Sequence, residues 1–333
     1  MKGLKERCYA GVRAGLLVGL VLAFLTSVFS VSRAVGGQQP AGTTKQSFDA
    51  ELVMIPVAVC GKKGSCAKGL PQDAFNVLSD KSSQEIAFFS NQDEPTSVAI
   101  LLDRSGSMSK SRTGVDIDDL VKKLLSHLMQ SGNRANEYIL LVFNQNFRLS
   151  DWTSDMQVML TALDKIASEP PTGRKALFDA CYLEIEKAKS RKHTRHALIL
   201  FTNGLDSSSN HNFSELRRLL SATNIVIYVI STVDFPSEHL GSLEQQGDSI
   251  LKEMASLSGG LIFHAKSKVE MENAFDLISQ DLHYQYLIGF KPKDSARDGK
   301  PHNITVKVAL PPNSPLERNH VLVRSRKSYI APK

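Results

Sequence analysis

The stretch VAILLDRSGSM, residues 98–108, joins a run of five apolar residues to a short polar loop. A short and almost continuous apolar run is typical of a strand that is buried on both faces of a parallel sheet. The loop that follows carries Asp103, Ser105 and Ser107 at alternate positions. In open α/β sheets, ligands bind beyond the carboxyl ends of the strands. The stretch therefore predicts a parallel sheet and a polar site at its edge.

The alternation of apolar runs and helical patterns continues to residue 283. Four more apolar runs predict strands at residues 138–143, 197–202, 225–231 and 260–264. Apolar residues at helical spacing predict helices near residues 117–128, 156–163, 177–188, 216–220 and 268–282. Such alternation is the signature of a parallel sheet with helices on both faces. Residues 97–283 are therefore predicted to form one α/β domain.

The segments on either side of this domain have a different pattern. Residues 46–96 and 284–330 contain extended runs, among them LVMIPVAV and YQYLIGF, separated by Pro, Gly, Asn and Asp. Neither segment alone has enough strands for an independent core. We predict that the two β segments pair into one small β-sandwich, with the α/β domain inserted between them. Two separate β caps on the α/β domain are the alternative.

The N-terminus has the pattern of an export signal, in which a basic stretch precedes the uncharged residues 14–32. Ser32-Arg33-Ala34 is a small-x-small pattern that a signal peptidase can cut, so we expect residues 1–34 to be a signal peptide. An uncleaved N-terminal membrane anchor is the alternative, and it is the one route to membrane contact. Residues 35–45 are expected to be a flexible linker. The protein is therefore expected to be exported, and to be periplasmic, associated with the cell envelope or secreted.

Most of the net charge lies in this N-terminal segment. The sequence has 40 Lys and Arg against 34 Asp and Glu, a formal net charge of +6. Residues 1–33 hold five of the basic residues and one of the acidic ones, which leaves 35 basic and 33 acidic residues in the remainder. Nucleic-acid-binding proteins carry clustered positive charge. We therefore exclude nucleic acid as a partner.

Two of the four cysteines are placed for a disulfide. Cys60 and Cys66 bracket Gly-Lys-Lys-Gly-Ser, a turn-rich stretch after an extended run. A hairpin brings two such sulfurs together, and an oxidising compartment locks them. A metal pair is the alternative, but no second Cys or His pair with zinc spacing stands nearby. Cys181 falls in a predicted helix, where we expect a buried apolar residue.

The side-chain oxygens of Asp103, Ser105 and Ser107 suit a hard cation. Mg²⁺ prefers oxygen ligands in an octahedral arrangement, and alternate positions of a tight loop turn three side chains toward one point. The place of the pattern, between a buried strand and a helix, strengthens this interpretation. A helix-capping turn is the alternative, because the same residue types favour it. In a metal site at the loop surface we expect Asp103 to face solvent.

The strand with DRSGS, the segment GRKALFDA at residues 173–180 and LILFTNG at residues 198–204 resemble the von Willebrand factor A domain. Residues 68–90 and the sequence after residue 284 are similar to exported von Willebrand A-related proteins of Acidobacteria. The resemblance implies a Rossmann-like domain with a binding role. It also implies a metal-ion-dependent adhesion site for Mg²⁺ or Mn²⁺, formed by Asp-x-Ser-x-Ser with a Thr and an Asp from two later loops. A protein partner would complete the coordination with an acidic residue.

Two positions of this chain depart from the family's motif. Lys175 stands where the second loop commonly has its Thr, and Asn203 stands where the third loop commonly has its Asp. Asp206 and Thr172 are near enough in sequence to act as substitutes. The candidate metal ligands of this degenerate site are Asp103, Ser105, Ser107 and Asn203.

The lysine raises three hypotheses about this site. Losing a carboxylate and adding an ammonium both lower the affinity for a cation. In the first hypothesis the degenerate site still binds Mg²⁺ or Mn²⁺. In the second, Lys175 places its ammonium beside Asp103 and stands in for the metal. In the third, Lys175 points outward as a solvated surface residue.

The sequence predicts a non-enzymatic, exported protein-interaction or adhesion module. It contains no Gly-x-Ser-x-Gly elbow, no His-Glu-x-x-His motif and no Gly-Lys-Ser/Thr phosphate loop. Its nine His residues show no convincing ligand spacing, and we predict no catalytic or cofactor-binding residue. The alternatives are a structural envelope protein with a vestigial site that binds no metal, and a hydrolase of unrecognised type.

Overall fold

The computed structural model describes residues 52–61, 65–110, 116–232, 241–264, 267–293, 297–312, 314, 316 and 321–331. The expected signal peptide and linker, residues 1–45, lie outside these ranges, as does the beginning of the N-terminal β segment at residues 46–51. In the part of the chain that is described, no helix is both long enough and apolar enough to cross a membrane.

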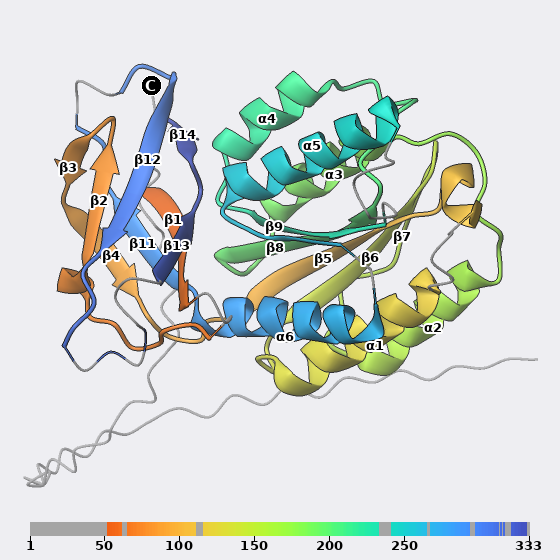
Figure 1. Cartoon of the computed structure of the whole chain (residues 1–333), viewed down its shortest axis with the longest axis horizontal. Helices are drawn as coiled ribbons and strands as arrows, with labels where there is room; N and C mark the ends of the chain where they lie inside the picture. The colour runs from red at the N-terminus through yellow and green to blue at the C-terminus, as the bar shows by residue number, and fades with distance from the viewer. Residues whose placement is uncertain are drawn as a thin grey trace, which may run out of the picture. The chain divides into compact units, whose positions relative to one another are not determined.

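The α/β domain is built on a six-stranded sheet, with strand order β10-β9-β8-β5-β6-β7 (Figure 1). Neighbouring strands are parallel except for β6 and β7. The strands are β5 Thr96–Asp103, β6 Glu137–Phe143, β7 Phe147–Leu149, β8 Arg195–Thr202, β9 Val226–Ser231 and β10 Ile262–His264. All five predicted strands are confirmed. The added strand β7 forms a hairpin with β6, and its three residues are too few to show a strand pattern.

Helices cover both faces of this sheet (Figure 1). They are α1 Ile117–Ser131, α2 Met156–Ala167, α3 Leu177–Ala188, α4 Phe213–Ser221, α5 Ser242–Ser258 and α6 Lys268–Tyr284. One buried cluster joins α1, α2 and α6 to one face, and a second joins α3, α4 and α5 to the other. Asp116, Asp155 and Asn212 start three of these helices by accepting hydrogen bonds from main-chain N–H groups of the first turn.

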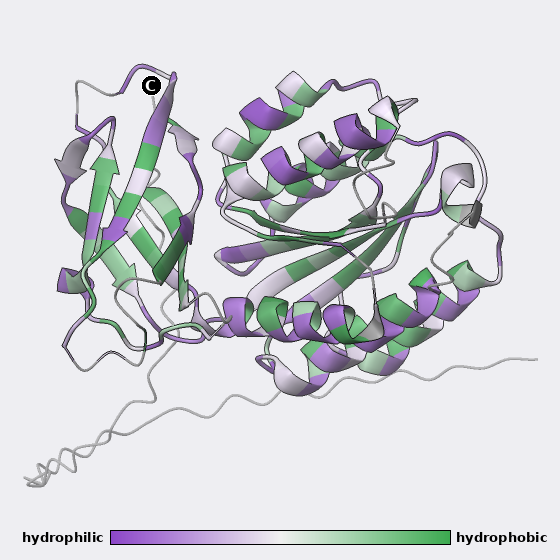
Figure 2. Ribbon diagram, in the orientation of Figure 1, coloured by the Kyte–Doolittle hydropathy of each residue, from purple (hydrophilic) through white to green (hydrophobic). Residues whose placement is uncertain are grey.

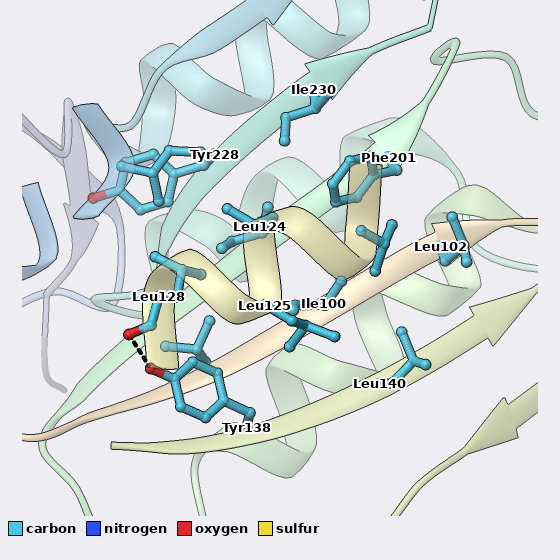
Figure 3. Close-up of a cluster of buried hydrophobic side chains, with 14 of the residues drawn as sticks. Ile100, Leu102, Leu124, Leu125, Leu128, Tyr138, Leu140, Phe201, Tyr228 and Ile230 are labelled. Carbon is cyan, nitrogen blue, oxygen red and sulfur yellow. Dashed lines mark hydrogen bonds between the residues drawn. The ribbon is translucent and has the colours of Figure 1, made fainter. Parts of the chain in front are cut away.

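The core under α1 shows why these segments fold as they do. Leu124 and Leu128 of α1 lie in one fully buried cluster with Ile100 of β5 and Tyr228 of β9 (Figure 3). The hydroxyl of Tyr138 in β6 donates a hydrogen bond to the carbonyl of Leu128 at 3.1 Å, so this buried polar atom is satisfied. The strands of the sheet are hydrophobic along most of their length, whereas the helices also carry hydrophilic residues (Figure 2). This pattern is the one that the sequence predicts for a sheet buried on both faces.

The two β segments form a β-sandwich of two four-stranded sheets, with strand orders β13-β1-β11-β4 and β14-β12-β2-β3. The strands are β1 Val53–Gly61, β2 Phe75–Ser79, β3 Ser82–Gln84, β4 Ile86–Ser90, β11 Tyr286–Phe290, β12 Pro301–Val308, β13 Val321–Ser325 and β14 Ser328–Ile330. Strand β1 pairs antiparallel with both β11 and β13, and β2 pairs with β12. A single apolar core contains residues of both sheets. The predicted insertion is thereby confirmed, and two separate caps are excluded.

An ion cluster in the sandwich joins the turn after β2 to β12. The ring nitrogens of His302 lie 2.6 Å from Asp80 Oδ2 and 3.0 Å from Asp298 Oδ1. The hydrogen bonds of Asp298 and of Asp80 raise the pKa of His302 above its ordinary value of 6.5. The main-chain N–H of Asn303 lowers the pKa of Asp80, and the hydrogen bond with His302 lowers the pKa of Asp298. The charged forms of all three side chains therefore stabilise this turn.

A buried ion pair connects the sandwich to the α/β domain. Arg324 of β13 forms two hydrogen bonds with Asp281 of α6, at 2.9 and 2.5 Å. Asp281 is fully buried and also accepts a hydrogen bond from the hydroxyl of Tyr228 at 2.8 Å. Burial lowers the pKa of the Arg324 guanidinium, but the attraction and hydrogen bonds of Asp281 more than offset this and raise it. The guanidinium therefore keeps its positive charge in the interior.

Cys60 and Cys66 form the predicted disulfide. The two residues face each other as an antiparallel bridge at the end of β1. Cys60 Sγ lies 3.5 Å from the Arg324 guanidinium, so the disulfide adjoins the ion pair described above. Cys181 is completely buried in α3, as predicted, and burial raises the pKa of its thiol.

Candidate functional site

Three loops meet at the carboxyl ends of β5 and β8. The first loop follows β5 and enters the short helix η2, Gly106–Lys110. The second loop, residues 172–176, precedes α3, and the third, residues 203–212, follows β8. Because β5 and β8 are adjacent and parallel, the loops that leave them begin side by side.

Main-chain hydrogen bonds fix these loops to one another. Gly106 N–H donates to the carbonyl of Gly173 at 3.0 Å, and Thr172 N–H donates to the carbonyl of Arg104 at 2.9 Å. The carbonyl of Lys175 accepts from the N–H groups of Ser207 and Ser208, both at 2.9 Å. The first loop is thus joined to the second, and the second is joined to the third.

Asp103 is the last residue of β5, and only 1% of it is exposed. Its Oδ2 accepts a hydrogen bond from the hydroxyl of Thr202 at 2.6 Å, and its Oδ1 accepts one from the main-chain N–H of Ser105 at 3.0 Å. The expectation that Asp103 faces solvent is therefore wrong. β5 is a central strand, and Lys175 of the second loop and Thr202 at the end of β8 enclose the carboxylate at its end.

The side chain of Lys175 points into the site. Its Nζ lies 2.6 Å from Asp103 Oδ2 and donates a hydrogen bond to Asn203 Oδ1 at 2.5 Å. The Lys175 and Asp103 side chains are 4% and 0% exposed. The hypothesis that Lys175 points into solvent is therefore wrong, because its side chain is buried and its ammonium is paired with the buried Asp103.

The two serines of the first loop contact each other. The hydroxyl oxygens of Ser105 and Ser107 lie 3.1 Å apart, with Ser105 buried and Ser107 exposed. Asn203 Oδ1 accepts a second hydrogen bond, from the N–H of Leu205 at 3.2 Å. Three of the four candidate ligands, Asp103, Ser105 and Ser107, thus lie at the end of β5 and in the first loop, and the fourth, Asn203, lies in the third loop.

The two substitute ligands are engaged elsewhere. Asp206 Oδ1 accepts hydrogen bonds from the N–H of Phe178 at 3.3 Å and from the hydroxyl of Ser209 at 2.6 Å, so it serves the first turn of α3. Thr172 is exposed, and its carbonyl accepts a hydrogen bond from the Asn144 side chain. The prediction that either residue could replace a ligand finds no support in these contacts.

The sequence analysis missed two residues of the site. Thr202 is completely buried and donates a hydrogen bond to Asp103. Its position at the end of a predicted strand could have identified it as a site residue. Arg104 forms two hydrogen bonds with Asp118 of α1, at 3.0 and 2.8 Å, and also bonds the carbonyl of Glu169. Arg104 thereby connects the first loop to α1, and no local sequence pattern predicts this contact.

A glycine sets the path of the third loop. Gly204 has a φ of +81°, in the left-handed region that favours glycine. A Cβ at this position would also lie 2.3 Å from the carbonyl oxygen of Gly247 in α5. Any side chain here would displace the loop or the helix, so glycine is required at position 204 for this close approach.

With Lys175 in this position, the donor set does not fit a divalent cation. The ammonium contacts the oxygens of Asp103 and Asn203 that a metal would need, and like charges repel strongly when they are buried. Elsewhere among the described residues, the ligand atoms of Cys60, Cys66 and Asp281 lie within 4.8 Å of one another. Both sulfurs are in the disulfide, so this group does not form a metal site either.

The sheet order, the helices on both faces and the polar loops at the carboxyl ends of the strands define a Rossmann-like α/β domain. The family model of the von Willebrand factor type A domain matches residues 97–277, which is more than half of the chain. The chain therefore belongs to the von Willebrand factor type A domain family. A search of curated proteins gives no significant match.

Several solved structures are similar to this chain. BatB from Bacteroides thetaiotaomicron is 18% identical with a TM-score of 0.43, over 56% of this chain and 98% of that one. The PilB minor pilin from Streptococcus sanguinis is 14% identical with a TM-score of 0.44, over 57% and 62%. Proximal thread matrix protein 1 from the mussel byssus is 16% identical with a TM-score of 0.43, over 60% and 49%. At these values the similarities carry no conclusion about function.

Proposed function

We propose that this chain is an exported, non-enzymatic protein-interaction module that binds a partner protein through its loop face. The loop face consists of the exposed residues of the three loops, namely Ser107, Thr172, Gly173, Arg174, Ser207, Asn210 and Asn212. The observation that carries the proposal is the fixed arrangement of these loops around the buried Lys175–Asp103 pair. Loops that are already ordered lose little conformational entropy when a partner binds.

The chemistry of the loop face suits hydrogen bonding to a protein surface. Hydroxyl and amide groups donate and accept, and Arg174 adds a planar guanidinium, a group enriched at binding hot spots. One nitrogen of this guanidinium bonds the carbonyl of Ser207, which holds the side chain across the second and third loops. A partner that offers carbonyl or carboxylate oxygens matches these donors.

The contacts favour binding over catalysis. Asp103 and Lys175 are paired with each other and buried, so neither is available as a base or nucleophile. His211 Nδ1 lies 2.7 Å from Asp179 Oδ1, and its ring stacks on Tyr182 at 3.9 Å. Within the described residues, no hydroxyl or thiol is hydrogen-bonded to this ring. A hydrolytic triad would need such a nucleophile.

Export is the second part of the proposal. The basic and apolar N-terminal pattern supports it. The Cys60–Cys66 disulfide supports it independently, because disulfides persist in oxidising compartments outside the cytoplasm. The partner is therefore sought in the cell envelope or among secreted proteins.

Affinity capture from an envelope extract tests the proposal. The mature chain is compared with Arg174→Glu on the loop face and with Lys307→Glu, a matched charge reversal at an exposed position of β12. We expect one protein to be captured by the parent and by Lys307→Glu, and to be lost with Arg174→Glu. Loss with Lys307→Glu alone would assign binding to the sandwich, and the absence of any captured protein would favour a purely structural role.

A further inference from the structure

We propose that the Lys175 ammonium is a built-in cation that takes the place of a divalent metal, so that the loops are organised without any metal. The three contributors to this centre come from three different loops. Lys175 belongs to the second loop, Asp103 ends β5 where the first loop begins, and Asn203 belongs to the third loop; the ammonium forms an ion pair with Asp103 and a hydrogen bond with Asn203. One nitrogen thus connects the same loops that a bound metal would connect.

The charges of the centre balance without a metal. A site of the family's usual pattern, as described above, supplies two aspartates, whose two negative charges match a divalent ion. This chain has one carboxylate, Asp103, and the amide of Asn203 replaces the other. One negative charge matches one ammonium. The two departures from the motif are therefore complementary, because each alone would leave a buried charge without compensation.

The ammonium is held in place by its own main chain. The N–H of Lys175 donates to the hydroxyl of Ser207 at 3.0 Å, and its carbonyl accepts from two N–H groups of the third loop. The ammonium donates a hydrogen bond to Asn203 and lies 2.6 Å from the carboxylate oxygen of Asp103 with which it is paired. A covalently tethered cation does not dissociate, so a chelator has nothing to remove.

This centre changes what a partner must offer. With the ammonium enclosed and only 4% of the Lys175 side chain exposed, no open coordination position is available to a partner's carboxylate. The sequence-based expectation of an acidic residue that completes a metal shell does not apply to this arrangement. Binding through the loop face then depends on hydrogen bonds from exposed groups such as Arg174, and it persists in the presence of a chelator. This last consequence rests on the proposed function, whereas the identity of the cation does not.

Calorimetric titration of the mature chain with Mg²⁺ and with Mn²⁺ tests the inference without any partner. The parent is compared with the double variant Lys175→Thr/Asn203→Asp, which restores the family's pattern. The control is Lys307→Thr/Asn91→Asp, which makes the same chemical changes at exposed positions. We expect the double variant to bind at least roughly tenfold more tightly than the parent and the control, because it gains a carboxylate and loses an ammonium. Equal affinity in the parent and the double variant would overturn the inference.

A second measurement tests the inference if the double variant does not fold, because it uses the parent protein. The melting temperature of the parent is followed as Mg²⁺ or Mn²⁺ is added, since a ligand that binds only the folded state must raise it. We expect no saturable rise beyond the one that NaCl produces at equal ionic strength. A saturable rise that Asp103→Asn abolishes would overturn the inference. Neither experiment involves the partner, so failure here is distinguishable from failure of the capture experiment.

Discussion

Replacing Lys175 by methionine removes the ammonium and keeps an unbranched apolar side chain. At 2.6 Å, two unit charges attract by about 6 kcal/mol at an effective dielectric constant of 20. The cost of burying both groups offsets part of this attraction in the parent protein. In the variant, Asp103 is left without a counter-ion in the interior, and losing one partner of a buried pair costs about 3–5 kcal/mol. We expect a loss near ~3 kcal/mol, at the low end, because Asp103 keeps its hydrogen bonds from Thr202 and Ser105.

Urea unfolding measures this loss, followed by circular dichroism and by the fluorescence of Trp152, the single tryptophan. Lys189→Met is the matched control, because Lys189 forms an exposed pair with Glu186 and should change stability by less than about 0.5 kcal/mol. Adding Asp103→Asn to Lys175→Met should restore part of the lost stability, since the stranded charge is then gone. A loss in Lys175→Met no larger than that of the control would refute the reasoning.

Three further changes test the sandwich and its junction. Cys60→Ser/Cys66→Ser should lower the free energy of unfolding by about 2 kcal/mol, because the closed loop is short; alkylation of the unfolded, unreduced parent should leave both cysteines unlabelled. Arg324→Met should cost about 3–5 kcal/mol in urea unfolding by stranding Asp281, and Arg324→Met/Asp281→Leu should cost clearly less. The raised pKa of His302 contributes stability that is fully present below pH 6.5 and is lost as pH rises through the folded-state pKa. The lowered pKa values of Asp80 and Asp298 contribute stability that is fully present above pH 3.8 and is lost as pH falls through their folded-state pKa values. His302→Gln should therefore reduce the difference in melting temperature between pH 6 and pH 8.5, and an unchanged difference would count against the cluster.

The strands of the α/β domain were accessible to sequence reasoning because their burial on both faces leaves almost continuous apolar runs. Helix α5 was not, because half of its buried face is not apolar: Gly247, Asp248 and Ser258 are buried beside Leu251 and Met254. A helix of this composition shows no clear apolar stripe. Whether small and polar residues are buried depends on the elements that pack against them, and the sequence of a single segment does not show which elements these are.

The membership of the site was also predictable, whereas its burial was not. Asp103 and Asn203 follow adjacent parallel strands, and the motif places Lys175 in the loop between them in sequence. That information suffices to bring the three residues together. The enclosure of Asp103, and the hydrogen bond that Thr202 gives it, depend on how the loops close over the strand ends. Loop closure is set by long-range main-chain contacts, which leave no periodic signal in the sequence.

The most direct test of the central claim is a crystal structure of the parent protein grown with excess MnCl₂, with anomalous scattering recorded near the manganese edge. The account predicts that Lys175 Nζ lies between Asp103 and Asn203 and that the loop site shows no anomalous peak. A manganese peak bonded to Asp103, with the Lys175 side chain turned toward solvent, would contradict it.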